Sequence, residues 1–247
     1  MSKFADIYGH EQIKEHLQNA IRLNKVSHAY IFNGPMGSGK KMTAGIFAET
    51  LQCERHGQEP CGTCHSCIQS ESGNQPDIIW VHHEKPGSIG VDDVREQVIG
   101  DMQIKPYSSR YKIYIIDEAE KLTQQAQNAL LKTIEEPPAY GIIILLTTNA
   151  DTFLQTILSR CVRLDFRPLR DTLVTQYLQE KYDLTDYECR FATAFAQGKI
   201  GRAVTIATSK EFAQLKEEVM HVIRYAKEMT TAEIMAEVKN IANYKLT

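Results

Sequence analysis

Short apolar runs and longer stretches of helical spacing alternate along the first two thirds of this chain. The apolar runs predict strands at residues 29–32, 78–81, 112–116 and 141–149, and we expect the strand at 78–81 to be buried. The spacing of apolar residues predicts helices at 10–24, 40–51, 68–73, 91–102, 123–136 and 153–158. Because strands and helices alternate, we expect a mostly parallel sheet with helices on both sides.

The pattern changes after Pro168. No further strongly β-rich run follows, and helical spacing continues at residues 171–181, 186–197, 202–209, 210–229 and 231–243. We therefore place a domain boundary at Pro168, between an α/β domain and a helical region.

Composition and charge narrow the class of protein. A chain of 247 residues, 43% of them apolar, is long enough to bury a core in one large α/β domain with a smaller helical part. The 28 basic and 31 acidic residues give a net charge of −3, which provides no basic surface for autonomous binding of nucleic acid. The apolar runs are too short to cross a bilayer, so we expect a cytoplasmic protein without membrane contact.

A glycine-rich loop separates the first predicted strand from the helix that follows it. Gly34, Gly39 and Lys40 match the phosphate-binding pattern G-x-x-x-x-G-K-[ST], and Gly37 lies inside the loop. Backbone N–H groups of such a loop bind phosphate, and Lys40 would reach the outer phosphates. Lys41 replaces the hydroxyl that holds Mg²⁺, which predicts weak or absent binding of ATP or ADP. The alternative is a glycine turn that caps a helix and binds nothing.

Polar residues also follow the later predicted strands. Asp117 and Glu118 come directly after residues 112–116, and Thr148 lies near the end of 141–149. At the carboxyl edge of a parallel sheet, Asp117 would hold a metal ion and Glu118 would polarise an attacking water. Thr148 suits a hydrogen bond to a γ-phosphate. We interpret the two acids as vestigial beside the altered loop, and the alternative is a solvated acidic turn.

Four cysteines fall within residues 53–67 with the spacing C-x₇-C-x₂-C-x₂-C. In a reducing compartment, such clustering favours a metal over disulfides, and four thiolates suit tetrahedral Zn²⁺. We therefore predict a structural zinc module with a closed ligand shell. Its ligands would be Cys53, Cys61, Cys64 and Cys67. Free core cysteines and an iron–sulfur cluster are the alternatives, and we interpret Cys161 and Cys189 as core thiols.

Two arginines are candidate functional residues because of their positions next to predicted helices. Arg160 follows the short helix predicted at 153–158, and Arg202 lies at the start of a later helix, after Gly201. From the residues alone, a surface salt bridge is the favoured interpretation of both.

Together these motifs resemble the AAA+ clamp-loader subunits of bacterial DNA polymerase III, from Tyr8 to about Ser209. The resemblance is carried by SHAYIFNGPMGSGKK, the four-cysteine insert, SGNQPDI, YIIDEAEKLTQQAQNALLKTIEEPP, TTN and ILSRC. Two kinds of subunit compete within the family: gamma/tau, which hydrolyses ATP, and delta-prime, whose phosphate loop is typically degenerate. Lys41 and SGNQPDI are similar to delta-prime, whereas the intact Asp117-Glu118 pair departs from many delta-prime sequences.

The resemblance implies an AAA+ domain at 1–168 with the zinc module at 53–67, a helical lid at 169–208 and the start of a collar domain at 209–247. It therefore implies a fragment. Arg160 would be an arginine finger that reaches ATP bound to a neighbouring gamma/tau subunit, and Arg202 would occupy the sensor-2 position. The implied partners are the gamma/tau and delta subunits and, through the assembled complex, the sliding clamp and primer–template DNA.

Three functions remain as hypotheses. The leading one is a non-motor (stator) subunit of the clamp loader, which has no ATPase activity of its own and completes a neighbour's ATP site. An ATP-hydrolysing gamma/tau-like motor subunit is the alternative, and Lys41 distinguishes the two. The third is a zinc-dependent DNA-binding module, which the near-neutral charge disfavours.

Overall fold

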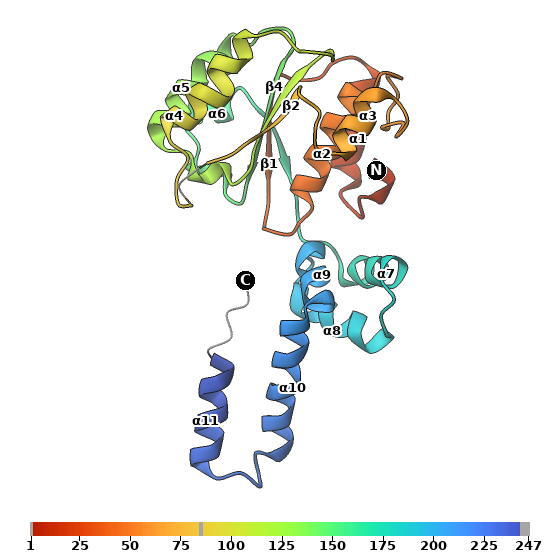
Figure 1. Ribbon diagram of the computed structural model, residues 1–247, viewed down its shortest axis with the longest axis vertical. Helices are drawn as coiled ribbons and strands as arrows, with labels where there is room; N and C mark the ends of the chain where they lie inside the picture. Colours follow the sequence, from red (N-terminus) through yellow and green to blue (C-terminus); the bar gives the residue numbers. More distant parts are fainter. Residues whose placement is uncertain (1, 84–85, 243–247) are drawn as a thin grey trace. The chain divides into compact units, whose positions relative to one another are not determined.

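The computed structural model describes residues 2–83 and 86–242, and the chain divides into two compact units, Met1–Pro168 and Leu169–Thr247 (Figure 1). The strands of the first unit are β1 (Ala29–Asn33), β2 (Ile78–Val81), β3 (Lys112–Ile116), β4 (Gly141–Thr147) and β5 (Val162–Asp165). Its α-helices are α1 (Glu11–Arg22), α2 (Lys40–Gln52), α3 (His65–Glu71), α4 (Val91–Val94), α5 (Gln124–Glu135) and α6 (Gln155–Leu158).

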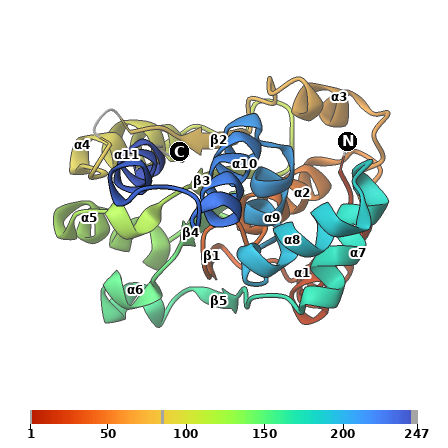
Figure 2. The same cartoon turned by 90° about the horizontal axis from the view of Figure 1, so that it is seen from below.

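The five strands form one parallel sheet in the order β2-β3-β4-β1-β5. In Figure 2, α4, α5 and α6 lie on one side of the strands, and α1, α2 and α3 lie on the other. Successive residues of a strand face opposite sides, so Ile31 packs with the α5 residue Leu130, whereas Tyr30 packs with the α2 residue Phe47. The predicted parallel sheet with helices on both sides is therefore confirmed.

The centre of the sheet is apolar because helices cover both of its faces. Every residue of β4 is buried, which matches its uninterrupted apolar run. At the edge, however, Ile78, Ile79 and Trp80 of β2 are partly exposed and only Val81 is buried. The strand predicted at 78–81 is confirmed, but the prediction that it is buried is wrong for three of its four residues, because an edge strand leaves part of its side chains uncovered.

The structure contains β5, a strand that the sequence pattern did not predict. β5 pairs with β1 at the other edge of the sheet, and of its four residues only Leu164 is buried. The helix predicted at 91–102 is also interrupted, since α4 continues as a π-helical segment (Arg95–Gly100) and a 3₁₀ turn (Asp101–Gln103). The predicted apolar stripe is nevertheless buried, at Val94, Val98 and Met102.

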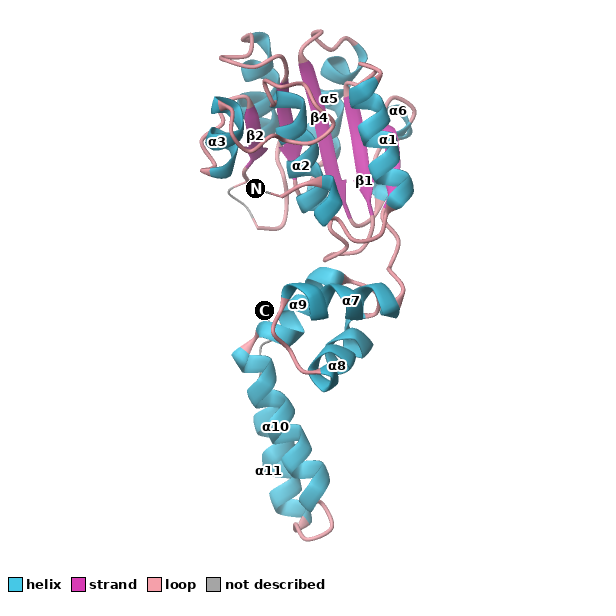
Figure 3. Ribbon diagram, turned by 90° about the vertical axis from the view of Figure 1, so that its right-hand side faces the viewer, coloured by secondary structure: helices cyan, strands magenta, loops and turns pink. Residues whose placement is uncertain are grey.

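The described residues of the second unit form helices, which are cyan in Figure 3, joined by loops, which are pink. They are α7 (Asp171–Lys181), α8 (Asp186–Ala196), α9 (Ile200–Thr208), α10 (Lys210–Tyr225) and α11 (Thr231–Ala242). Helices α7, α8 and α9 share a small core that includes Val174, Leu178 and Cys189. Asn243, the predicted end of the last helix, lies outside the described residues. The lid and collar roles assigned to these helices stay predictions.

Candidate functional site

The glycine loop between β1 and α2 has a backbone that requires glycine. Gly34, Gly37 and Gly39 have φ angles of 156°, 78° and 91°, a range that side chains with a Cβ rarely adopt. A Cβ on Gly34 would lie 2.3 Å from the carbonyl oxygen of Phe166. Phe166 follows β5 and donates its own N–H to the Asn33 oxygen at 2.6 Å, so this contact is fixed by the sheet.

Replacing Gly34 by alanine is expected to lower the free energy of unfolding by about 2–4 kcal/mol, because the added methyl group meets a backbone atom and the φ angle is strained. Chemical denaturation measures the change. Gly87→Ala is the matched control, since its Cβ would meet nothing within 4 Å. Equal unfolding midpoints for the two variants would contradict the structural role of Gly34.

Lys40 is held inside the glycine loop. Its ammonium group donates to the carbonyl oxygens of Gly34 and Pro35, at 2.5 and 2.9 Å, and only 9% of the residue is exposed. Burial lowers the pKa of Lys40, while the charges of Glu120 and Asp117 act in the opposite direction. An ammonium group has three N–H donors, so a phosphate oxygen can accept the third without displacing either loop carbonyl.

Lys41 forms an ion pair with Asp117. The Lys41 ammonium lies 3.2 Å from Asp117 Oδ2 and 5.2 Å from the centre of the Trp80 ring. The other carboxylate oxygen of Asp117 accepts the N–H of Glu118 at 3.0 Å. An ammonium group thus contacts the carboxylate that the sequence pattern assigned to a metal ion.

Glu118 contacts Lys121, the last residue of the 3₁₀ turn Ala119–Lys121, and His83. Its Oε2 atom lies 2.6 Å from the Lys121 ammonium and 3.5 Å from Nε2 of His83. Its φ angle of 51° is in the left-handed region, which is uncommon for a residue with a side chain. The structure therefore brings the two predicted acids together at the end of β3, with each carboxylate paired to a lysine.

Thr148 is bound by a carboxylate that the sequence reasoning did not single out. Its hydroxyl donates to Glu120 Oε1 at 2.7 Å, and its backbone N–H donates to Oε2 at 3.2 Å. The 3₁₀ turn after β3 brings Glu120 back to the end of β4. The signal in the sequence was a third acid shortly after Asp117, but only the strand order shows which residue it meets.

His10 is a second residue that sequence reasoning missed. Its Nε2 atom donates to the Ser38 carbonyl oxygen at 3.1 Å, and its ring centre lies 4.8 Å from that of Phe166. Burial lowers the pKa of His10. The hydroxyl of Ser38 is buried and has no hydrogen-bond partner among the residues that the structure describes, so it is a donor that a phosphate oxygen would satisfy.

Arg160 lies on the surface after α6. Its guanidinium is 3.1 Å from Glu135 Oε1 at the end of α5, and it donates to the Thr156 carbonyl oxygen at 3.0 Å. The side chain is 40% exposed, so the guanidinium is accessible to a partner. Arg202 is exposed in the first turn of α9, in the second unit. The finger and sensor-2 roles of these arginines stay predictions.

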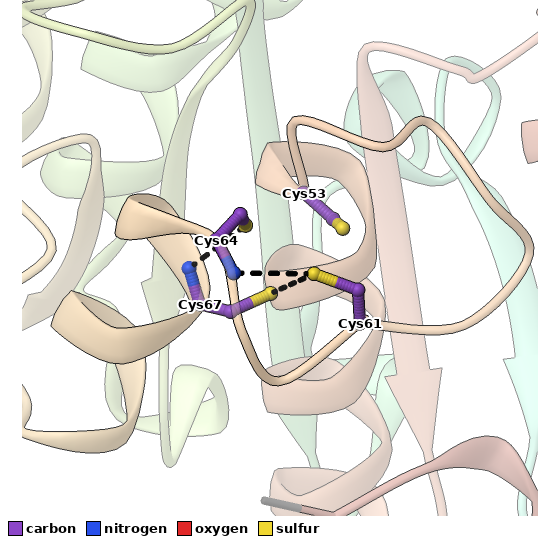
Figure 4. Close-up of side chains that lie close together, drawn as sticks. All are labelled: Cys53, Cys61, Cys64 and Cys67. Carbon is purple, nitrogen blue, oxygen red and sulfur yellow. Dashed lines mark hydrogen bonds between the residues drawn. The ribbon is translucent and has the colours of Figure 1, made fainter.

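The four clustered cysteines meet between α2 and α3 (Figure 4). Cys53 follows α2, Cys64 precedes α3, and Cys67 lies in the first turn of α3. The four sulfur atoms all lie within 4.8 Å of one another, and those of Cys61 and Cys67 are 3.9 Å apart. A tetrahedral zinc ion with Zn–S bonds of about 2.3 Å separates its sulfurs by about 3.8 Å, so this arrangement fits zinc.

Backbone N–H groups around the cluster point at the sulfur atoms. The N–H of Cys64 donates to Cys61 Sγ at 3.3 Å, and the N–H of Cys67 donates to Cys64 Sγ at 3.4 Å. Hydrogen bonds, first of all from the N–H of Thr63, lower the pKa of Cys61 to about 5. Such donors favour the Cys61 thiolate, whereas burial raises the pKa of Cys53 and of Cys67. Among the described residues, His56 and His65 are exposed and are not part of this group.

Residues 9–170 match the protein family described as "DNA polymerase III, delta subunit". The curated relatives include subunit tau/gamma of DNA polymerase III from Haemophilus influenzae, 38% identical over 82% of this chain and 30% of the relative. Subunit tau from Bacillus subtilis is 40% identical over 73% of this chain and 32% of the relative. Subunit delta' from the same organism is 34% identical over 83% of this chain and 61% of the relative.

The chain thus spans about a third of the tau relatives and less than two thirds of the delta' relative. Among solved structures, a gamma subunit-related protein from Thermotoga maritima has a TM-score of 0.54 at 22% identity, over 91% of this chain and 77% of that one. The RuvB Holliday junction branch migration motor of the same organism has a TM-score of 0.53 at 16% identity, over 94% and 69%. These two likenesses show the fold alone. No helix in the described ranges is long and apolar enough to span a membrane.

Proposed function

Because the chain belongs to the family of DNA polymerase III clamp-loader subunits, we propose that it is a non-motor (stator) subunit of that complex. In this role it helps load the sliding clamp onto DNA during replication, and it completes the ATP site of a neighbouring subunit with Arg160. The observation that carries the proposal is the ion pair between Lys41 and Asp117, at 3.2 Å.

This ion pair disfavours ATP hydrolysis by the chain itself. In P-loop ATPases, a hydroxyl at the position of Lys41 and a carboxylate at that of Asp117 hold the Mg²⁺ that bridges the outer phosphates. Here the first residue has no oxygen, and its ammonium group contacts the second. If a nucleotide binds, Lys40 and Lys41 would neutralise its phosphates in place of the metal ion. The buried Ser38 hydroxyl adds a donor, so the loop retains groups that fit a phosphate.

The isolated chain is expected to hydrolyse no ATP above background and to bind nucleotide with little dependence on Mg²⁺. Lys41→Thr supplies the missing oxygen and is expected to make binding depend on Mg²⁺. Lys41→Met is the matched control, because it removes the charge without supplying a metal ligand. Titration calorimetry with and without Mg²⁺, together with a phosphate-release assay, measures both properties. Mg²⁺-dependent binding and steady hydrolysis by the unmodified chain would instead establish the motor alternative.

The motor alternative is kept because of one specific observation. The Asp117-Glu118 pair is intact at the end of β3, as an active site would require. Yet both carboxylates are paired with lysines, which would have to be displaced before metal binding. For this reason we favour the stator role.

The proposed partners follow from the stator role. They are the gamma/tau and delta subunits and, through the assembled complex, the sliding clamp and primer–template DNA, in the cytoplasm.

A net charge of −3 argues against the third hypothesis, an autonomous DNA-binding module. We assign zinc to the structure of the 53–67 module, since four sulfur ligands leave no open position for catalysis.

A further inference from the structure

Thr148, which follows β4, has two hydrogen-bond donors, its hydroxyl and its backbone N–H. The carboxylate of Glu120 accepts both of these hydrogen bonds. We propose that Glu120 competes with the outermost phosphate of a nucleotide, so that the glycine-loop site accepts a nucleoside diphosphate in preference to a triphosphate. The inference deepens the proposed function, because it rests on the glycine loop being a nucleotide site without motor activity. Glu120 thereby acts as a specificity-determining residue of this site.

The strand register places Thr148 beside the loop. Asn33 of β1 pairs with Thr147 of β4, and the N–H of Gly34 donates to the Thr147 carbonyl oxygen at 3.1 Å. Thr148 is the next residue, so it lies where the phosphate loop begins. A donor at this place is suited to a phosphate beyond those that the loop itself surrounds.

The Glu120 carboxylate imitates the acceptor oxygens of such a phosphate. One of its oxygens accepts the Thr148 hydroxyl at 2.7 Å and the other accepts the Thr148 N–H at 3.2 Å. The charge of Glu120 also acts on Lys40, the lysine expected to reach the outer phosphates. A terminal phosphate would therefore have to displace a carboxylate from Thr148 and compete with its charge at Lys40.

Glu120 carries its negative charge at neutral pH. Burial opposes ionisation, but the hydrogen bonds, first of all that from the Thr148 side chain, outweigh it and lower the pKa of Glu120. Like charges that lie close together repel more strongly where they are partly buried, as Glu120 is. A diphosphate avoids most of this repulsion, since the loop N–H groups and the N-terminal end of α2 bind its phosphates without Thr148.

Glu118, the other glutamate of this turn, does not compete with a phosphate for Thr148. Its carboxylate contacts Lys121 at 2.6 Å, and Lys121 also donates to the Pro86 carbonyl oxygen at 2.7 Å. This pairing holds Glu118 toward the segment that includes Pro86. Of the two glutamates, only Glu120 contacts Thr148 in the described residues.

The test compares fluorescent derivatives of ADP and ATP as probes, without Mg²⁺. The unmodified chain is expected to bind the ADP probe about tenfold more tightly than the ATP probe, a ratio that corresponds to about 1.4 kcal/mol. Glu120→Gln keeps the length of the side chain and removes its charge, and should reduce the ratio to nearly one. Glu120→Asp retains the charge and should preserve the preference for ADP. Glu96→Gln, which removes an exposed carboxylate from the segment Arg95–Gly100, is the charge-matched control and should leave the ratio unchanged.

An unchanged ADP-to-ATP ratio in Glu120→Gln would overturn the inference. So would an equal gain for both probes, because a general electrostatic effect does not discriminate the terminal phosphate. Failure of the unmodified chain and of Glu120→Gln to bind either probe would also overturn it. Failure of the stator proposal has a different signature, namely Mg²⁺-dependent ATP hydrolysis. Since the probe ratio is measured without Mg²⁺, the two results are independent.

Discussion

Replacing Cys64 by serine is expected to abolish zinc binding and to unfold the segment 53–67, while the α/β core remains folded. The four sulfur atoms lie within 4.8 Å of one another, so the loss of one ligand opens the shell of any ion they hold. In small zinc-binding peptides, binding of a structural zinc ion contributes about 10–16 kcal/mol, which is also the free energy of folding. A module as short as this one would lose most of its stability with the metal.

The core should survive because, among the described residues, neither apolar cluster on the two faces of the sheet includes a residue of the 53–67 module. Leu51 at the end of α2 belongs to one of these clusters, whereas all residues from Glu54 to Gln58 are exposed. Elemental analysis gives the zinc content, limited proteolysis reports the order of the segment, and far-ultraviolet circular dichroism reports the core. Cys161→Ser is the matched control, since Cys161 packs at the edge of the core beyond α6 and should not affect the metal.

Three results would contradict the zinc prediction. The first is a zinc content near zero in the unmodified protein, purified under reducing conditions without chelators. The second is an equal loss of zinc from Cys161→Ser, since it would show that the metal is held nonspecifically by thiols. Retention of zinc in Cys64→Ser would place Cys64 outside the ligand set.

Features that depend on neighbours in the sequence could be predicted. The cysteine spacing predicted the cluster because Cys61, Cys64 and Cys67 are close in the sequence. They lie in the first turn of α3 and in the loop that precedes it. The order of strand, glycines and helix predicted the loop between β1 and α2, where Gly37 and Gly39 have positive φ angles. The uninterrupted apolar run of β4 predicted a strand, which the structure contains at Gly141–Thr147.

Features that depend on distant pairing could not be predicted. β5 is short and carries Arg163 and Asp165 on its exposed side, so its composition resembles that of a loop. The close approach of Phe166 to Gly34 exists only because β5 pairs with β1. The pattern placed both Lys41 and Asp117 near one edge of the sheet, but the contact between them follows from the strand order and the side-chain conformations.

Replacing Arg160 by alanine is expected to impair ATP hydrolysis in the assembled clamp loader and to leave this chain intact. Arginine fingers supplied by a neighbour contribute about 10³- to 10⁵-fold in related phosphoryl-transfer systems, although further ATP sites in a ring would dilute the loss of one. The guanidinium is planar and permanently charged, so it stabilises charge on a γ-phosphate better than lysine does. We therefore expect a partial loss of activity, which Arg160→Lys restores only slightly.

The stability of the isolated chain should change little. Arg160 and Glu135 form an exposed ion pair, with 40% and 44% of their side chains accessible, and such pairs contribute about 0–1 kcal/mol. Thermal unfolding and zinc content of Arg160→Ala should therefore match those of the unmodified chain. The activity measurement uses a complex reconstituted with the full-length subunit, and size-exclusion chromatography verifies equal assembly, since a lost interface would resemble a lost finger.

Glu135→Gln separates the arginine from its ion pair. This variant removes the carboxylate that holds Arg160 in the free chain but leaves the guanidinium available to a neighbour's ATP. If Arg160 acts in trans, Glu135→Gln should retain DNA- and clamp-stimulated hydrolysis, while Arg160→Ala should reduce both hydrolysis and clamp loading. Equal losses in the two variants would mean that the ion pair itself supports the complex. Unmodified rates in assembled Arg160→Ala would show that Arg160 is a surface residue only, and the stator would then have to act without completing its neighbour's site.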